Sequence, residues 1–257
     1  MVETSPPANK ITIRRGRVAD TAAISRAHYE ALDQFHEFYG TFFKMHPREL
    51  IPMMTGRAFA ETAPAQVFYV AEDGGTGDVV GFVRYSIKEA RKEEEKEKEK
   101  EDEEKKKKRE DGESPFACKE ELREVWKAFN EAQGERDATL EGAAKGQRHM
   151  WIQHLMIRPS HQRRGVGRAL LSTALECADA EGLPSVIVSS AESVRLYSQA
   201  GFASLDSFRL DNGHWAREAA RAMADAREGE GLVARYDGVF EVEDVMVRDA
   251  RGGEVPV

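Results

Sequence analysis

The sequence has few cysteines and no excess of positive charge, and both shortages exclude classes of protein. Cys118 and Cys177 are its two cysteines, and neither lies in a paired motif such as CxxC, so we expect neither a disulfide framework nor a zinc site. The net charge of −8 argues against a general nucleic-acid-binding protein, because neutralising phosphates requires a basic surface. The same acidity would weakly attract basic substrates such as amines.

Long apolar runs are absent as well. No segment approaches the length that a bilayer span requires, and the polar N-terminus lacks the apolar stretch of a signal peptide. We therefore expect a soluble intracellular protein that binds neither a membrane nor a nucleic acid. The cytoplasm is the expected compartment, with the nucleus as the alternative, and the sequence leaves the oligomeric state open. The 257 residues, 40% of them hydrophobic, suffice for one sizeable core.

One segment, residues 88–111, consists almost entirely of charged residues. It holds eleven basic and twelve acidic residues with Ala90 between them, so no apolar stripe is available to join a core. We interpret it as an insertion (88–113) that is either a solvated helix of coiled-coil character or disordered. Its basic run, Lys105 to Arg109, also matches a nuclear-localisation patch, but the acidic flanks favour the solvated insertion. The predicted organisation is a flexible N-terminus (1–10), one domain (11–250) that contains the insertion, and a tail (251–257).

Periodicity along the rest of the chain predicts alternating strands and helices. Strands are predicted near 11–14, 66–72, 79–87, 150–157, 186–188, 202–210 and 240–248. Helices are predicted near 17–31, 35–45, 116–133, 165–180, 189–199 and 212–227, with a loop at 135–147. Asp20 is expected as the N-cap of the first helix, and Ser189 opens capping-box spacing. This order predicts a mixed α/β sheet with helices on both faces.

A glycine-containing turn leads from one predicted strand into the long helix that follows it. The first amide groups of a helix lack internal partners and lie at its positive end, so such a turn can bind phosphate or pyrophosphate. Gly165 and Gly167 leave out side chains that would hold an anion away from those amides. Arg163, Arg164 and Arg168 either add positive charge to the site or point to solvent.

Other nucleotide-binding motifs do not match this turn. A P-loop requires GK[ST], where this chain has Arg168-Ala169, and a dinucleotide fingerprint requires a third glycine where this chain has Leu170. A glycine pair without further context is more often an ordinary helix start than an anion site. The surrounding residues therefore decide the interpretation.

Residues 149–167 read HMWIQHLMIRPSHQRRGVG, which resembles the GNAT superfamily of N-acetyltransferases. There a strand and a loop lead into a (Q/R)xxGx(G/A) pyrophosphate turn, matched here by Gln162, Gly165 and Gly167. Residues 196–202, LYSQAGF, resemble the LYxxxGF element of that family at the right distance. The resemblance implies a mixed, mostly antiparallel central sheet with helices on both faces, acetyl-CoA as cosubstrate and no metal. The long charged insertion resembles those of fungal members.

The resemblance also implies roles for particular residues. The residues expected to bind the pyrophosphate are Gln162, Arg163, Arg164, Gly165, Val166, Gly167 and Arg168. The backbone of Leu155, Met156 and Ile157 is expected to hold the pantetheine arm and to polarise the thioester carbonyl, which is compatible with side chains that pack in the core. Tyr197 matches the tyrosine that protonates the departing thiolate, since a phenol with a pKa of about 10 stays protonated at neutral pH. Its alternative role is packing beside Leu196 and Phe202.

The general base is where the chain departs from the family pattern. Related enzymes place a glutamate or histidine at the positions of Trp151 or Gln153, or a glutamate at that of Val188, and none of these residues accepts a proton usefully. His154 titrates near neutrality, but regular strand alternation would point it away from the face of Gln153. We therefore expect a water chain, or an amine that binds already neutral.

The sequence thus predicts an acetyl-CoA-dependent N-acetyltransferase that transfers the acetyl group directly to an amine. Residues 35–46, rich in aromatic side chains and histidines, are expected to help form the acceptor side unless they simply pack on the sheet. The alternative is an acyl-CoA-binding or scaffold protein that keeps the fold and has lost catalysis. The missing base favours this alternative, and Tyr197 argues against it.

Overall fold

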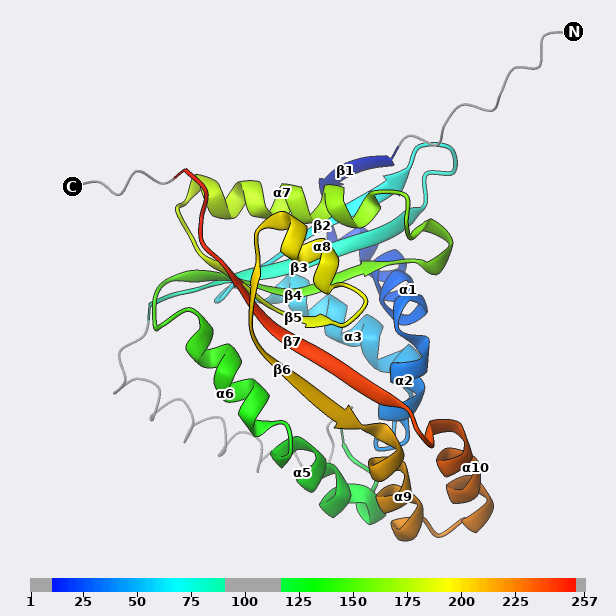
Figure 1. Cartoon of the computed structure of the whole chain (residues 1–257). Helices are drawn as coiled ribbons and strands as arrows, with labels where there is room; N and C mark the ends of the chain where they lie inside the picture. The colour runs from blue at the N-terminus through cyan, green and yellow to red at the C-terminus, as the bar shows by residue number, and fades with distance from the viewer. Residues whose placement is uncertain (1–10, 91–116, 253–257) are drawn as a thin grey trace, which may run out of the picture.

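A seven-stranded sheet organises the chain (Figure 1). The computed structural model describes residues 11–90 and 117–252. The strands follow the order β1 (Ile11–Arg15), β2 (Gln66–Asp73), β3 (Val79–Lys88), β4 (His149–Ile157), β5 (Ser185–Ser190), β7 (Phe240–Arg248) and β6 (Ala203–Asp211). All neighbours pair antiparallel except β4 and β5, which are parallel. The predicted mixed, mostly antiparallel sheet is confirmed.

Helices cover both faces of this sheet, as predicted. Helices α1 (Thr21–Ala31), α3 (Pro47–Ala60) and α6 (Gly134–Ala143) pack on one face, and α7 (Val166–Ala180) and α8 (Val194–Ala200) on the other. Helices α9 (Asn212–Ala222) and α10 (Ala226–Tyr236) connect β6 to β7 and lie at the far end of these two strands (Figure 1). They pack with α2 (Asp33–Gly40) and α5 (Arg123–Glu131) around a cluster of aromatic rings. None of the helices in 11–90 and 117–252 has the length and apolarity that a bilayer span requires.

Several local predictions are wrong because tertiary contacts override the local pattern. The predicted loop at 135–147 contains α6, whose weak periodicity is compensated by the packing of Ala143 and Ala144 against the strand residues Val186 and Val245. The helix predicted from Ser189 begins only at Val194, because Ser189 and Ser190 pair with β7.

Asp20 occupies the N-cap position of α1, as predicted, but its carboxylate accepts hydrogen bonds from Arg14 and from the Arg17 backbone and none from the helix. Two further boundaries differ from the predictions. The helix predicted at 35–45 ends at Gly40, and Pro47 begins the separate helix α3, since proline fits the first turn of a helix. The helix predicted at 212–227 is two helices, α9 and α10.

Most of the charged insertion, from 91 to 113, lies outside the described residues, as do 1–10 and 253–257. The predicted domain limits, the helical or disordered character of the insertion and the fungal-type assignment that rests on it therefore stay predictions.

Candidate functional site

The parallel strands β4 and β5 pair at only two positions and then diverge. Met150 pairs with Ser185 and Trp151 with Val186. Beyond Trp151, β4 keeps β3 on one edge, while no described residue pairs with its other edge. Because pairing stops at Trp151 and Val186 and the two strands run in the same direction, the gap between them lies toward their carboxyl ends.

The backbone of β4 faces this gap at alternate residues. The Arg158 amide donates to Val80 O of β3 at 2.9 Å, and a Cβ built on Gly81 of β3 would lie 2.8 Å from Met156 O. The backbone of Met156 therefore faces β3. Since backbone direction alternates along a strand, the N–H and C=O groups of Leu155 and Ile157 face the open edge. Of the three residues predicted to hold the pantetheine arm, two present their backbone to the gap.

The turn after β4 brings unpartnered amides to the same place. Gln162 Nε2 donates to Ile157 O at 3.0 Å and so ties the turn to the end of the strand. Arg163 and Gly165 both have left-handed backbone conformations, with φ of 61° and 82°. Such turns direct successive amides into one concavity, the geometry that binds anions. No described acceptor partners the amides of residues 166–168, which open α7.

Glycine is favoured at positions 165 and 167 for two different physical reasons. Gly165 has the positive φ that glycine adopts without strain, and the space beside it is open. Gly167 instead allows close packing, because its Cβ would lie 3.2 Å from Ile157 Cδ1 and 3.5 Å from Leu196 Cδ2. The Val166 side chain is buried in the core, so only its backbone faces the turn.

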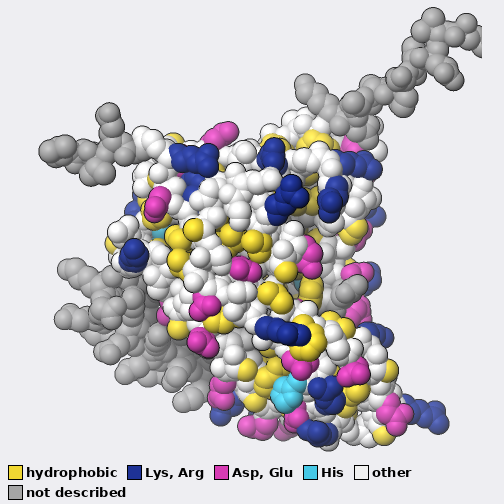
Figure 2. Space-filling model, in the orientation of Figure 1, with side chains coloured by type: hydrophobic (Ala, Val, Ile, Leu, Met, Phe, Trp, Pro, Cys, Tyr) yellow, Lys and Arg dark blue, Asp and Glu magenta, His cyan; other side chains and the backbone are white. Residues whose placement is uncertain are grey.

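The predicted arginines surround this turn with positive charge. Arg163, Arg164 and Arg168 are exposed, and basic side chains gather over α7 on this face of the molecule (Figure 2). Arg168 also donates to Gln199 Oε1 at 2.8 Å and links α7 to α8. A chain with a net charge of −8 thus has a locally basic site for an anion.

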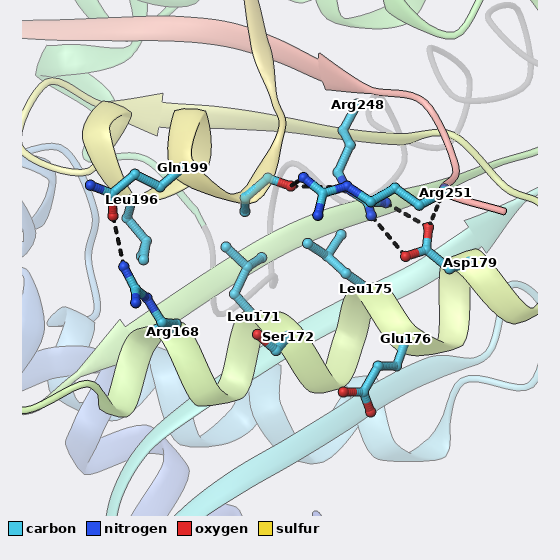
Figure 3. Close-up of a pocket in the computed structure, with 11 residues that line it drawn as sticks. Arg168, Leu171, Ser172, Leu175, Glu176, Asp179, Leu196, Gln199, Arg248 and Arg251 are labelled. Carbon is cyan, nitrogen blue, oxygen red and sulfur yellow. Dashed lines mark hydrogen bonds and ion pairs between the residues drawn. The ribbon is translucent and has the colours of Figure 1, made fainter.

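A groove of about 480 Å³ continues from Arg168 between α7 and α8 (Figure 3). Leu171, Leu175 and Leu196 form its apolar wall. At its far end Arg248 pairs with both carboxylate oxygens of Asp179, at 2.8 and 2.7 Å, and Arg251 approaches from the C-terminal segment. No sequence motif indicates this end of the groove, because Arg248 lies 80 residues beyond Arg168 along the chain.

Tyr197 lies on α8 within the core below α7. Its side chain is 4% exposed, and its ring contacts that of Phe202 edge-on with centroids 5.6 Å apart. Burial raises the pKa of Tyr197, so its hydroxyl stays protonated throughout the neutral range. None of the described residues forms a hydrogen bond with this hydroxyl. The ring thus has the predicted packing role, and the hydroxyl keeps its proton for donation.

A β-bulge in β4 interrupts the regular alternation that was assumed for His154. Arg84 of β3 pairs with His154 and Tyr85 with Ile152, so Gln153 is the extra residue. Unbroken alternation would separate His154 from the face of Trp151. The bulge instead places both on the face covered by α1 and α6, where the His154 ring lies 4.6 Å from that of His28.

His154 is nevertheless a poor proton acceptor. Burial, together with the positive charge of Arg84, lowers its pKa to about 3. Gln153 Oε1 is buried without a hydrogen-bond partner in the described chain. Neither His154 nor Gln153 is therefore suited to act as the base. Within 11–90 and 117–252, no group of three or more His, Cys, Asp or Glu side chains could hold a metal ion.

The buried histidines predict loss of stability in mild acid. Burial lowers the pKa values of His28, His36 and His154 below the usual 6.5, so the unfolded chain binds more protons once the pH falls below about 6.5. For His154 the free energy of unfolding should fall by about 1.4 kcal/mol per pH unit between pH 6.5 and 5. Urea unfolding at several pH values measures this slope. His154→Gln should flatten it, and His214→Gln, which alters an exposed histidine, should leave it unchanged.

Comparison with known proteins shows which family the chain belongs to. The acetyltransferase (GNAT) family model matches residues 30–202, and the chain belongs to that family. Members use acetyl-CoA as cosubstrate, and the open edge of β4 and the free amides of the turn fit that molecule. Comparison with curated protein sequences gave no match.

Solved structures share the fold at low sequence identity. Arylalkylamine N-acetyltransferase 2 from Aedes aegypti is 14% identical with a TM-score of 0.56, covering 94% of this chain and 99% of its own. Mosquito arylalkylamine N-acetyltransferase like 5b is 13% identical with a TM-score of 0.53, covering 93% and 100%. A Corynebacterium glutamicum structure, described as histone acetyltransferase HPA2 and related acetyltransferase, is 15% identical with a TM-score of 0.51, covering 95% and 99%. These likenesses concern the fold.

Proposed function

We propose that this protein is an acetyl-CoA-dependent N-acetyltransferase that acetylates a primary amine directly. The observation that carries the proposal is the continuity of the open edge of β4 with the unpartnered amides at the start of α7. A thioester arm would lie along Leu155 and Ile157, with its pyrophosphate on residues 162–168. The groove between α7 and α8 would receive the nucleotide end.

Each step of the proposed reaction is assigned to particular groups of the protein. The amine nitrogen of the acceptor attacks the thioester carbonyl carbon, and the amide N–H groups at the open edge stabilise the charge that develops on the carbonyl oxygen. As the C–S bond breaks, Tyr197 donates its proton to the sulfur. The nitrogen loses one proton to water or to a base, which leaves an N-acetylated amine and free CoA thiol. Tyr197 then regains its proton from solvent.

A second candidate, an acyl-CoA-binding protein without catalysis, is favoured by one observation. The positions of Trp151, Gln153 and Val188 hold no base, and His154 is too acidic to replace one. The two candidates share the acetyl-CoA site and differ only in turnover.

One experiment separates them. Calorimetry measures acetyl-CoA binding, and thiol release is then followed with a panel of polyamines, amino acids, aminoglycosides, arylamines and peptides with free N-termini. We expect binding and turnover with at least one class of amine. Binding without turnover across the panel would favour the second candidate, and absence of binding would contradict both.

A further inference from the structure

Glu241 is a buried carboxyl group that forms no ion pair with the described residues. It lies on β7 and is 9% exposed. Its one hydrogen-bond partner in the described chain is the Asn212 side chain, whose Nδ2 donates to Glu241 Oε1 at 2.6 Å. A buried carboxylate costs free energy unless it is paired, so an unpaired one calls for an explanation.

Neighbouring charges do not neutralise it. The charged groups that act on Glu241 are Glu243 and Arg136, and Glu241 in turn acts on Tyr39 and Tyr236. Tyr236 is also affected by the charges of Arg235 and Glu37. Arg136 is already engaged, with Glu243 at 2.6 Å and Asp137 at 2.7 Å. Burial raises the pKa of Tyr39, and the negative charges of Glu241 and Glu243 act in the same direction, against the positive charge of Arg136.

Asn212 adds a second acceptor without a donor. The residue is fully buried, and its Oδ1 atom has no hydrogen-bond partner among the described residues. The second oxygen of Glu241, Oε2, accepts no hydrogen bond from them either. Two oxygen acceptors that lack donors, one of them an acid, match an ammonium group, which offers three N–H donors and a positive charge.

The location connects this pair to the gap between β4 and β5. Ser190, the last residue of β5, pairs with Glu243 of β7, and Glu241 lies two residues further on. The pair therefore lies past the end of β5, the end toward which the gap lies. The surrounding side chains are aromatic, with Tyr39, Phe38 and Tyr236 among them, and aromatic faces attract organic cations.

We propose that Glu241 and Asn212 form the subsite that recognises an ammonium group of the acceptor. The acceptor is accordingly an organic cation, an amine carried on an apolar body that packs against the aromatic cluster. This inference rests on the proposed function for its connection to acetyl transfer, but the binding of a cation can be measured separately. Glu241 is assigned recognition of the cation, and proton transfer is left to the mechanism above.

The test uses the full chain and three defined amines: 2-phenylethylamine, hexylamine and spermidine. Each is titrated calorimetrically into the wild-type protein, with CoA at saturation and again without CoA. We expect Glu241→Gln to weaken the tightest-binding amine at least tenfold and to change CoA affinity less than twofold. The matched control is Glu230→Gln, which removes the same charge from an exposed position on α10 and should bind amines like the wild type. Neutral 2-phenylethanol should not distinguish Glu241→Gln from the wild type.

The pH dependence gives an independent measurement. Burial raises the pKa of Glu241 to about 7, so amine affinity of the wild type should fall as the pH is lowered from 7 to 5.5 and the carboxylate gains a proton. In Glu241→Gln this dependence should disappear.

The outcomes separate this proposal from the proposed function. Equal amine affinity of Glu241→Gln and wild type, or no wild-type binding of any of the three amines, would overturn the subsite. Loss of CoA binding in the wild type would overturn the proposed function, and the titrations without CoA would still decide the role of Glu241.

Discussion

Replacing Gly165 with aspartate is expected to abolish acetyl-CoA binding. Gly165 stands at the start of α7 with a φ of 82°, beside amides that have no acceptor among the described residues. A carboxylate there would meet the pyrophosphate with a like charge and could itself accept from the free amides. At about 5 Å and an effective dielectric constant of about 20, the repulsion is roughly 3 kcal/mol, or about a hundredfold in affinity. Calorimetric titration with acetyl-CoA measures the loss.

Gly165→Asn is the matched control for this change. Asparagine and aspartate have nearly the same shape, and both tolerate the left-handed region better than other side chains do. The open space beside Gly165 accommodates either side chain. We expect the asparagine variant to bind within about tenfold of the wild type, so that the difference between the two reports charge alone. Intact affinity in the aspartate variant would show that the turn is not the anion site.

Replacing Tyr197 with phenylalanine is expected to lower turnover by about a hundredfold or more, the usual contribution of a positioned general acid. Affinity for acetyl-CoA should stay nearly unchanged. The ring packs against Phe202 in either variant, while the hydroxyl makes no hydrogen bond with the described residues. The change therefore removes a proton donor and little packing. Steady-state thiol release and calorimetric binding measure the two effects separately.

Tyr85→Phe serves as the control, because it removes a hydroxyl from a tyrosine buried in the same core. Thermal denaturation of both variants shows whether the fold is kept. We expect Tyr85→Phe to retain wild-type turnover within about twofold. Unchanged turnover in Tyr197→Phe on the best substrate would remove the assignment of Tyr197 as the acid and leave its packing role.

The sequence predicted the fold well where neighbouring residues act together. Period-two alternation marked the strands of the sheet, and the turn at 162–168 was found because strand, glycines and helix follow each other directly. The sequence did not predict α6, where packing on the sheet compensates a weak pattern. It also did not predict the bulge at Gln153, after which the residues of β4 lie on the opposite faces from those that regular alternation would give them.

The candidate site also has parts that the sequence predicts and parts that only the tertiary structure shows. The sequence by itself determined the family and the position of the turn that we predict to bind an anion, because free amides at a helix start depend on consecutive residues. The tertiary structure alone decided that β4 and β5 diverge, that His154 is buried beside His28, and that Glu241 meets Asn212 without a cation. Burial and missing partners arise only when distant segments pack together, and a glutamate has no pattern along the chain that reveals what will surround it.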